Sequence, residues 1–338
     1  MTRIFLLGAT GYIGGEVIHE LSTTHPEYEI AALVRNPEKA KNVTAAYPQV
    51  RVVNGDLDNA DVIEEEARKS DIVIHAASNK HLPSVEAIAR GLKGRRNAYY
   101  IQVTGASVLG GPEIDNDSYG EPSDDIHNDL DGIQAVREKI TAYPNRRVVD
   151  NFILNLKGSG PKTAIIFPPI IFGKGRGPGN QRSIQVPSIA KNALQRKQAA
   201  YVGRGLAKWG AIHVADLASL FGKLVERAVA SGEDEGDGEV WDENGLYFVD
   251  NGEMSFKDIA ALVADEVHKL GYADKPGLTQ SITPQECDSE FFAHGAVVLG
   301  TNARGRALRA RKLLGWEPVK GTLEEYIPET VAIEARSL

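Results

Sequence analysis

Short apolar runs alternate with amphipathic segments along the first half of the chain. Residues 4–7 are entirely apolar, as expected of a parallel strand that is covered on both faces. In the segment that follows, Ile13, Val17, Ile18 and Leu21 recur at helical spacing and give a helix one apolar face. Further strands are predicted at residues 29–34, 50–53, 71–77, 98–103 and 163–167, and helices at 61–69, 84–92, 133–140 and 146–156. This alternation predicts an α/β fold built on a doubly wound parallel sheet.

The pattern changes beyond residue 170. Residues 172–182 (FGKGRGPGNQR) are rich in glycine and basic residues, but they lack the Gly-Lys-Ser/Thr ending of a P-loop, so we interpret them as a substrate loop. After this loop we expect a helix at 187–195, a strand and turn at 199–205, a helix capped by Asp216 that runs to Val229, an acidic surface loop at 231–243, a strand at 246–249 and a helix at 256–270.

These elements predict two domains. Residues 1–170 form the nucleotide-binding domain, and residues 206–250 return to it. Residues 171–205 and 251–338 form a smaller α/β domain that binds the substrate.

The first strand runs directly into a glycine turn, GATGYIG. Gly8 lets the chain turn sharply, Gly11 lets backbone approach a pyrophosphate, and Gly14 lets the helix pack close to the strand. The N–H groups at the start of the helix then face the phosphates. The turn therefore predicts a Rossmann dinucleotide site that comprises Gly8, Thr10, Gly11, Tyr12, Ile13 and Gly14.

The end of the second strand bears on the choice of cofactor. An acidic residue at this place binds the ribose of NAD, whereas a cation suits the 2′-phosphate of NADP. The chain has Arg35 and Asn36 here, with Lys39 and Lys41 close behind. We therefore expect NADP(H) to be preferred, with NAD(H) possible. The alternative is that Arg35 is a solvated loop residue.

Other strand ends complete the predicted site. Asp56 is expected to bond the adenine and Leu57 to pack on it, although Asp56 or Asp58 can equally cap the next helix. Small residues after the fourth strand let the cofactor pass, while His75 within that strand is interpreted as packed rather than catalytic. The remaining residues assigned to the cofactor are Ala76, Ala77, Ser78, Thr104 and Pro168.

Composition narrows the class of protein. The net charge of −8 and the pI near 5.6 argue against nucleic acid as a partner. Cys287 is the only cysteine, which excludes an internal disulfide and a cysteine-based metal site and indicates a reducing compartment. The apolar run at 4–7 is too short for a signal peptide, and no stretch has the length of a membrane span. We expect a cytoplasmic protein without a metal site. The sequence leaves open whether the protein forms a homodimer.

Several motifs together resemble the extended and atypical short-chain dehydrogenases/reductases, in particular the epimerase/dehydratase-like and NmrA-like branches. The resemblance implies an NAD(P) site on the Rossmann sheet and a substrate cleft closed by the C-terminal part. The motifs that carry it are GATGYIG from residue 8, LVRNPEKA from 33, GDL from 55, HAAS from 75, VTGASVLG from 103, IIFPPIIFGKG from 165 and IHVADLA from 212.

The same resemblance implies a catalytic Ser or Thr after the fifth strand and a Tyr-x-x-x-Lys motif on a later helix. There the phenol exchanges a proton with the substrate and the cation lowers the phenol pKa. This chain has Gly105 at the usual Ser position, with the hydroxyls of Thr104 and Ser107 on either side, and no Tyr-x-x-x-Lys. Its nearest equivalent runs from Tyr143 to Arg147.

Registration of the motif on Asp150 places Ala142 and Arg146 at the Tyr and Lys positions. Either Tyr143 acts from a shifted start of the helix, or the motif is broken. Arginine stays charged, yet it can still bond a ribose and lower the pKa of a neighbouring phenol.

Two functions of different class follow. The first is an NADP(H)-dependent oxidoreductase or epimerase for a small carbonyl or hydroxyl substrate, with Tyr143 as acid/base, Thr104 or Ser107 polarising the carbonyl, and Arg147 in support. The second is a non-catalytic protein that senses NADPH and signals through a partner. A sugar-nucleotide enzyme would need a further anion site, for which Lys174, Arg176 and Arg182 are candidates.

Overall fold

The computed structural model describes residues 1–230 and 237–338. Its centre is a parallel sheet whose seven strands run in the order β11-β7-β5-β4-β1-β2-β3. The chain reverses its direction of winding between β1 and β4, which is the arrangement that creates a ligand crevice at the carboxyl ends of the strands. The strands are β1 (Arg3–Leu7), β2 (Glu29–Val34), β3 (Arg51–Asn54), β4 (Ile72–His75), β5 (Tyr99–Val103), β7 (Lys162–Phe167) and β11 (Leu246–Phe248).

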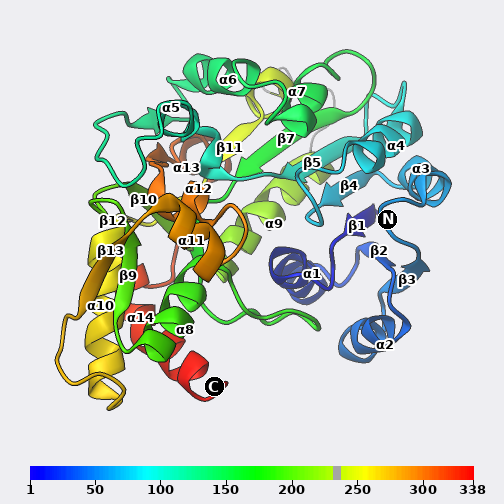
Figure 1. Ribbon diagram of the computed structural model, residues 1–338. Coiled ribbons are helices and arrows are strands. Elements are labelled where there is room, and N and C mark those ends of the chain that lie inside the picture. The colour runs from blue at the N-terminus through cyan, green and yellow to red at the C-terminus, as the bar shows by residue number, and fades with distance from the viewer. Residues whose placement is uncertain (231–236) are drawn as a thin grey trace.

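Helices cover both faces of this sheet (Figure 1). One layer contains α3 (Ala60–Lys69), α4 (Leu82–Leu92), α7 (Val148–Leu154) and α6 (Ile133–Thr141), which pack against one another in that order. On the other face α1 (Tyr12–Thr24) packs along α9 (Val214–Ala230), and α2 (Pro37–Ala46) lies beside β2 and β3. The predicted doubly wound α/β fold is confirmed.

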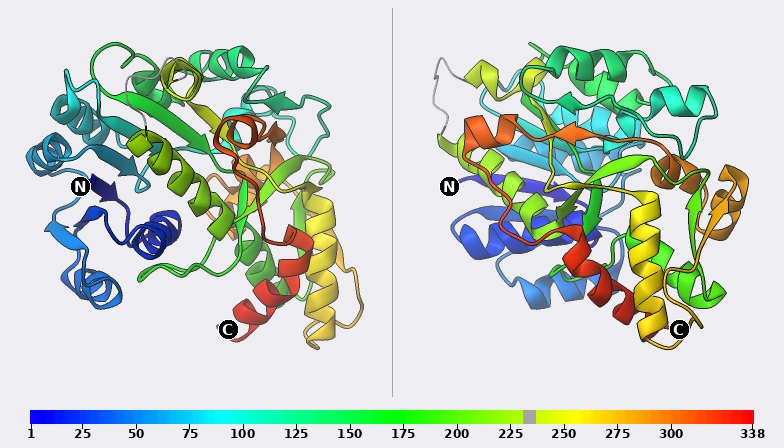
Figure 2. Two further views of the ribbon diagram at one scale, coloured as in Figure 1. Left: turned by 180° about the vertical axis from the view of Figure 1, so that it is seen from behind. Right: turned by 90° about the vertical axis from the view of Figure 1, so that its left-hand side faces the viewer.

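A second buried cluster lies beside the sheet. It is centred on Val186, Phe256, Ile259 and Leu323. The long helices α10 and α14 lie side by side here (Figure 2). Its elements are β8 (Ile170–Phe172), α8 (Gln185–Arg196), β9 (Ala199–Val202), β10 (Lys208–His213), β12 (Glu253–Ser255), α10 (Phe256–Lys269), β13 (Thr279–Ile282), α11 (Pro284–Glu290), α12 (Gly295–Gly300) and α14 (Leu323–Ala335).

The segment between β5 and α7 crosses the carboxyl edge of the sheet, as expected, and carries the short elements α5 (Gly111–Asp115) and β6 (His127–Asn128). The strand β6 pairs with β14 (Gly305–Arg306), which is followed by α13 (Arg309–Leu314). Short 3₁₀ turns at 106–108, 237–239 and 242–244 complete the described elements.

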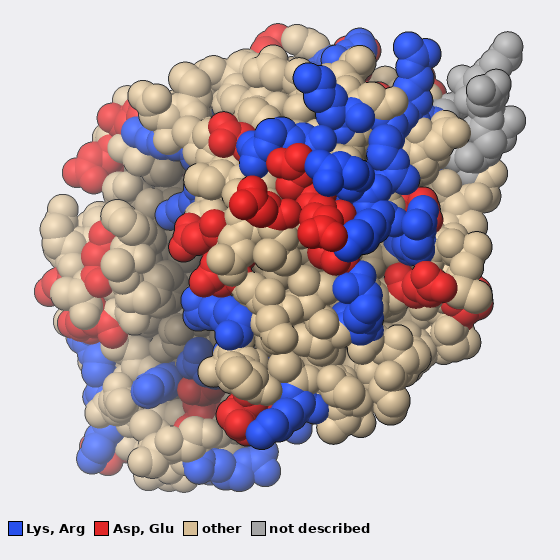
Figure 3. Space-filling view, turned by 90° about the vertical axis from the view of Figure 1, so that its right-hand side faces the viewer, with Lys and Arg blue, Asp and Glu red and all other residues tan. Residues whose placement is uncertain are grey.

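Charged side chains of both signs are interspersed on the face shown in Figure 3, where the surface is also hollowed between two lobes. On α3 and α4, Glu64 pairs with Arg68 at 2.6 Å and with Arg90 at 2.9 Å. Within the described part of the chain, no helix is long and apolar enough to cross a membrane.

The start of α9 corrects one prediction. The helix begins at Val214, so Asp216 lies within its first turn and is not the N-cap. The ring Nδ1 of His213 accepts a hydrogen bond from the Ala215 N–H at 3.1 Å and caps the helix instead. The carboxylate of Asp216 accepts the N–H groups of Val319 and Lys320 at 3.1 and 3.0 Å, and thereby fixes the chain before α14.

The acidic stretch 231–243 also differs from its interpretation as a solvated loop. Residues 231–236 lie outside the described residues. Beyond them Val240 and Trp241 are buried, and Trp241 packs on the ring of Tyr99 with centroids 4.8 Å apart. The carboxylate of Asp242 accepts the Thr163 N–H at 3.0 Å. This end of the stretch therefore packs against the sheet.

Candidate functional site

The glycine turn has the geometry that a dinucleotide site requires. Gly8 has a φ of 101°, and a Cβ there would lie 2.7 Å from the carbonyl carbon of Ala76. A Cβ at Gly14 would lie 2.2 Å from the carbonyl oxygen of Gly8, so α1 can approach β1 this closely only without a side chain. The Gly11 N–H donates to the same oxygen at 2.8 Å and closes the turn.

The N-terminus of α1 has no side-chain cap and is suited to bind an anion. Gly11 is its N-cap, no side chain caps it, and its first turn contains no acidic residue. The N–H groups of Tyr12 and Ile13 stand at this uncapped end, next to Thr10. Free N–H groups and the positive end of the helix dipole are what a pyrophosphate binds. The residues present therefore fit a nicotinamide dinucleotide.

The ends of β2 and β3 lie together at the same edge, because the Gly55 N–H donates to Val34 O at 3.3 Å. Arg35 follows β2 directly and is exposed. Asn36 is the N-cap of α2, where its side chain accepts the Lys39 N–H at 3.0 Å. This places Asn36 and Lys39 in the first turn of α2, beside Arg35.

After β3, the side chain of Asp56 accepts the N–H of Asp58 at 3.0 Å. Asp56 therefore stabilises its own turn, and Asn59, not Asp58, is the N-cap of α3. Leu57 is half-buried against the core of the sheet.

The end of β4 forms the wall beside the glycine turn. The Ala76 N–H donates to Leu7 O at 2.9 Å, Ala77 is exposed, and the Ser78 hydroxyl accepts the N–H groups of Lys80 and His81. His75 is fully buried, bonds Ser84 Oγ at 3.0 Å, and has its pKa lowered to about 3 by burial. The interpretation of His75 as a packed residue is confirmed.

A buried polar network joins the end of β5 to the start of α7. Thr104 Oγ1 donates to Asp150 Oδ2 at 3.2 Å. Arg147 Nη1 lies 3.8 Å from that oxygen, and Arg147 Nη2 donates to Ser107 Oγ at 3.0 Å. Pro168 reaches the same edge, since its carbonyl accepts the Ala106 N–H at 2.9 Å. The structure thus brings Thr104, Ser107 and Arg147 together.

Burial is the largest influence on the pKa values of Asp150 and Arg147 in this network. It raises the pKa of Asp150 to about 6, although Arg147 and the Thr104 hydroxyl both stabilise the carboxylate. Burial also lowers the pKa of Arg147, which Asp150 partly offsets. No local sequence pattern marks Asp150 as part of a polar network, because its hydroxyl partner Thr104 follows β5 and lies 46 residues earlier in the chain.

Tyr143 has different neighbours. Its ring packs over Gly111, where a Cβ would lie 2.2 Å from the ring, and the Arg146 guanidinium stands 5.1 Å from the ring centroid. Partial burial and a hydrogen bond to Asp115 raise the pKa of the phenol. Arg147 is one turn away, with its N–H bonded to Tyr143 O at 2.9 Å, but its guanidinium points to Ser107 and Asp150.

The glycine-rich loop at 172–182 lies on the N-terminal turns of α1. The Asn180 N–H donates to Thr10 O at 3.0 Å, and Tyr12 Oη donates to Gly173 O at 2.5 Å. A Cβ at Gly177 would lie 2.4 Å from Gly15 Cα, and one at Gly179 would lie 2.3 Å from Thr10 O. The closely spaced glycines of this loop are the sequence signal for such a close approach of two backbones.

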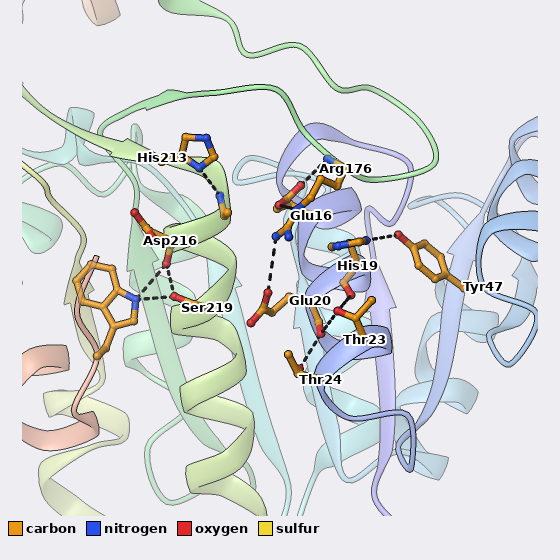
Figure 4. A network of polar contacts seen from close by, with 12 residues as sticks. Glu16, His19, Glu20, Thr23, Thr24, Tyr47, Arg176, His213, Asp216 and Ser219 are labelled. Carbon is orange, nitrogen blue, oxygen red and sulfur yellow. Dashed lines mark hydrogen bonds and ion pairs between the residues drawn. The ribbon is translucent and has the colours of Figure 1, made fainter. Parts of the chain in front are cut away.

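The loop is also held by an ion pair between the buried Glu16 and the half-exposed Arg176, drawn in Figure 4. Glu16 of α1 is fully buried and accepts both the backbone N–H and the Nε of Arg176 at 2.6 Å. Arg182 makes two hydrogen bonds to Glu334 at 2.6 and 3.0 Å. Two of the three cations that were candidates for a further anion site are therefore engaged with carboxylates.

A cavity of about 1310 Å³ opens beside this loop. Lys174 and Arg182 of the loop, Lys191 of α8, and Phe291 and Phe292 after α11 contribute to its lining. Cations, hydroxyls and aromatic rings line one hollow, a composition that accommodates a small organic molecule with polar groups.

Comparison with known proteins identifies a nicotinamide-cofactor domain in the first half of the chain. A family model described as NAD(P)H-binding matches residues 8–129. Oxidase ucsJ of Acremonium sp is 33% identical over 350 residues, which cover 99% of this chain and 98% of the relative.

Two solved structures have the same fold. The PbgP3 protein of Burkholderia pseudomallei superimposes with a TM-score of 0.66 and 15% identity, covering 98% of both chains. UDP-glucuronic acid 4-epimerase of Bacillus cereus, in complex with UDP-glucuronic acid and NAD, superimposes with a TM-score of 0.62 and 13% identity over all of both chains.

Proposed function

Because the chain belongs to the extended short-chain dehydrogenase/reductase family, we propose that it is an NADP(H)-dependent oxidoreductase or epimerase acting on a small carbonyl or hydroxyl compound. The observation that carries the proposal is the Thr104, Ser107 and Arg147 group, which stands on the same edge of the sheet as the glycine turn. A relative named as an oxidase and a fold neighbour named as an epimerase support the reaction class.

The residues of this chain would act on the substrate oxygen. The cofactor, when bound, supplies or accepts a hydride. Arg147 donates to Ser107 Oγ, so the Ser107 proton is free to point at a substrate carbonyl and polarise it. Tyr143 is assigned as acid/base because it begins the turn that carries Arg147, and it must leave Asp115 to serve. The second buried cluster and its cavity are assigned to substrate binding.

Calorimetric titration with NADP(H) and NAD(H) tests the cofactor. We expect binding of both and tighter binding of NADP(H), because Arg35 is exposed beside the ends of β2 and β3. Arg35→Glu should weaken NADP(H) by at least about tenfold and leave NAD(H) nearly unchanged. If wild type binds neither form, the proposal is wrong.

Turnover is tested with a panel of aldehydes, ketones and nucleotide sugars. We expect cofactor oxidation with a small carbonyl compound, a loss of about 100-fold in Ser107→Ala and a comparable loss in Tyr143→Phe. Full activity in Tyr143→Phe would remove this residue from the mechanism.

The second candidate function is a sensor of NADPH without chemistry. The raised pKa of Tyr143 favours it, because a phenol bonded to Asp115 is a poorer acid/base at neutral pH than one beside a free cation. A sensor would bind the cofactor tightly and show no turnover above background with any compound of the panel. Measurable turnover excludes it.

A further inference from the structure

Asp150 carries a buried carboxyl group, one oxygen of which has no hydrogen-bond partner among the described residues. It is the third residue of α7 and only 1% exposed. Its Oδ2 accepts the Thr104 hydroxyl at 3.2 Å, but its Oδ1 is buried without a hydrogen-bond partner among the described residues. A buried carboxylate oxygen without a partner costs stability, and a native protein keeps such a group for a reason.

A structural role at the helix terminus does not explain this carboxyl. An acidic residue in the first turn commonly stabilises a helix through the dipole or by capping exposed N–H groups. The α7 N-terminus has no side-chain cap, and the Asp150 side chain is instead turned to Thr104 at the end of β5. The carboxyl is therefore placed for contact with the strand end, where the proposed substrate oxygen lies.

The groups around Asp150 set how it can work. Thr104 contacts it from the end of β5, and Arg147 approaches to 3.8 Å from the start of α7. The Tyr100 phenol of β5 also lies near, and burial, with the Asp150 charge as a second cause, raises its pKa. One cation and one hydroxyl thus face the carboxyl. Both protonation states are accessible near neutral pH, since burial raises the Asp150 pKa to about 6.

We propose that Thr104 and Asp150 form a proton relay, in which the Thr104 hydroxyl exchanges a proton with the substrate oxygen and Asp150 is the proton reservoir behind it. This inference rests on the proposed function, because the relay needs a carbonyl or hydroxyl substrate. Thr104 is the group that touches substrate. Asp150 acts through it as a positioning and proton-holding residue.

The relay balances in both directions. In reduction, a hydride from the cofactor adds to the carbonyl carbon, and the carbonyl oxygen forms its O–H bond with the Thr104 proton. Thr104 Oγ1 takes the proton of the neutral Asp150 carboxyl, and Arg147 stabilises the resulting carboxylate until a solvent proton replaces it. Oxidation runs these steps in reverse, with the substrate hydroxyl proton passing through Thr104 to the Asp150 carboxylate.

The first test needs neither cofactor nor substrate. The ¹³C resonances of the aspartate carboxyls are followed across pH in the protein alone, and the Asp150 signal is assigned by its loss in Asp150→Asn. We expect this signal to titrate near pH 6 and its midpoint to rise in Thr104→Val, which removes a hydrogen bond to the carboxylate. A wild-type titration midpoint near pH 4, or a midpoint that is the same in Thr104→Val as in wild type, overturns the relay.

The second test is the pH profile of turnover. Reduction needs the neutral carboxyl, so the wild-type rate should fall as pH rises through the Asp150 midpoint. Asp150→Asn should lose about 100-fold in kcat together with that pH limb, and Thr104→Val should lose as much. Thr104→Ser, which retains the hydroxyl, should recover most of the rate and the pH limb relative to Thr104→Val. Asp131→Asn, at an exposed position, is the matched control and should keep the wild-type profile.

The outcomes separate the relay from the proposed function. Wild-type turnover with an unchanged pH limb in Asp150→Asn overturns the relay and leaves the proposed function intact. Absence of wild-type turnover overturns the proposed function and with it the relay's catalytic role, whatever the carboxyl titration shows. The relay replaces Tyr143 as the group that transfers the proton, and the phenol then only hydrogen-bonds the substrate oxygen. Tyr143→Phe should therefore lower the rate and keep the pH limb, and loss of the limb in that variant would assign the proton transfer to the phenol and overturn the relay.

Discussion

The buried carboxylate of Glu16 and the half-exposed guanidinium of Arg176 form an ion pair that joins α1 to the glycine-rich loop. The carboxylate of Glu16 is inaccessible to solvent and accepts two hydrogen bonds of 2.6 Å from Arg176, one from backbone and one from the side chain. A buried carboxylate is stable only when its charge and its lone pairs are satisfied. The loop therefore helps to hold α1 in place, while its Lys174 and Arg182 line the neighbouring cavity.

The first prediction concerns the fit of this loop. Gly177→Ala places a Cβ 2.4 Å from Gly15 Cα, where both partners are backbone, so the loop must move away from α1. We expect trypsin to cleave after Lys174, Arg176 or Arg182 at least about tenfold faster than in wild type, because cleavage follows the population of the opened segment. Gly238→Ala, where a Cβ meets nothing within 4 Å, is the control. Equal cleavage rates in Gly177→Ala and wild type would contradict the close packing.

The second prediction concerns the glycine turn. In Gly14→Ala the added Cβ would lie 2.2 Å from Gly8 O, which forces α1 away from β1 and displaces the N–H groups at its start. We expect nicotinamide cofactor binding to weaken by at least about 100-fold in calorimetry. Gly222→Ala in α9 is the control, since a Cβ there makes only ordinary contacts at 3.8 Å. Unchanged affinity in Gly14→Ala would mean that the phosphates bind elsewhere.

The sheet and the glycine turn were predictable because their signals are local. Most of these strands appear in the sequence as short runs of apolar residues, and the turn appears as glycines at fixed spacing before a helix. Most predicted strands and helices of the sheet half accordingly lie within two residues of the observed ones. The confirmed burial of His75 has the same origin, because it stands inside such a run.

Long-range pairing was not predictable in the same way. Asp216 looked like a helix cap, but its partners Val319 and Lys320 come more than 100 residues later. Asp129 stood in a polar acidic segment, yet it is fully buried against β11 and α13. Single-sequence patterns fix neither the partner nor the depth of a polar side chain, since both depend on how distant elements pack.

The third prediction concerns Asp129. Its Oδ1 accepts the N–H groups of Leu308 and Arg309, and its Oδ2 accepts that of Phe248, each at 2.8 Å. Asp129→Asn replaces one acceptor with a donor and leaves at least one buried N–H unsatisfied. We expect the free energy of unfolding in urea to fall by about 3 kcal/mol, against a change within about 0.5 kcal/mol for the exposed Asp131→Asn. A loss no larger than that of Asp131→Asn would show that these bonds contribute little.

The fourth prediction concerns the pH dependence of stability that Asp150 imposes. Burial raises its pKa from 3.8 to about 6, so between these values the folded protein holds a proton that the unfolded chain has released. The contribution of Asp150 to stability is therefore fully present only well below the unfolded pKa of 3.8 and is lost as pH rises through 6, a total loss of about 3 kcal/mol for a shift of about two pKa units. The side chain of residue 150 cannot ionise in Asp150→Asn. Asp129, whose pKa is also raised by burial, titrates in both proteins, so its contribution cancels in the difference between them. We expect the free energy of unfolding of wild type minus that of Asp150→Asn to fall by about 2 kcal/mol between pH 4 and 7, because part of the full loss already occurs below pH 4. A difference that stays constant over this range would mean that Asp150 is already ionised at pH 4 and holds no proton for a relay.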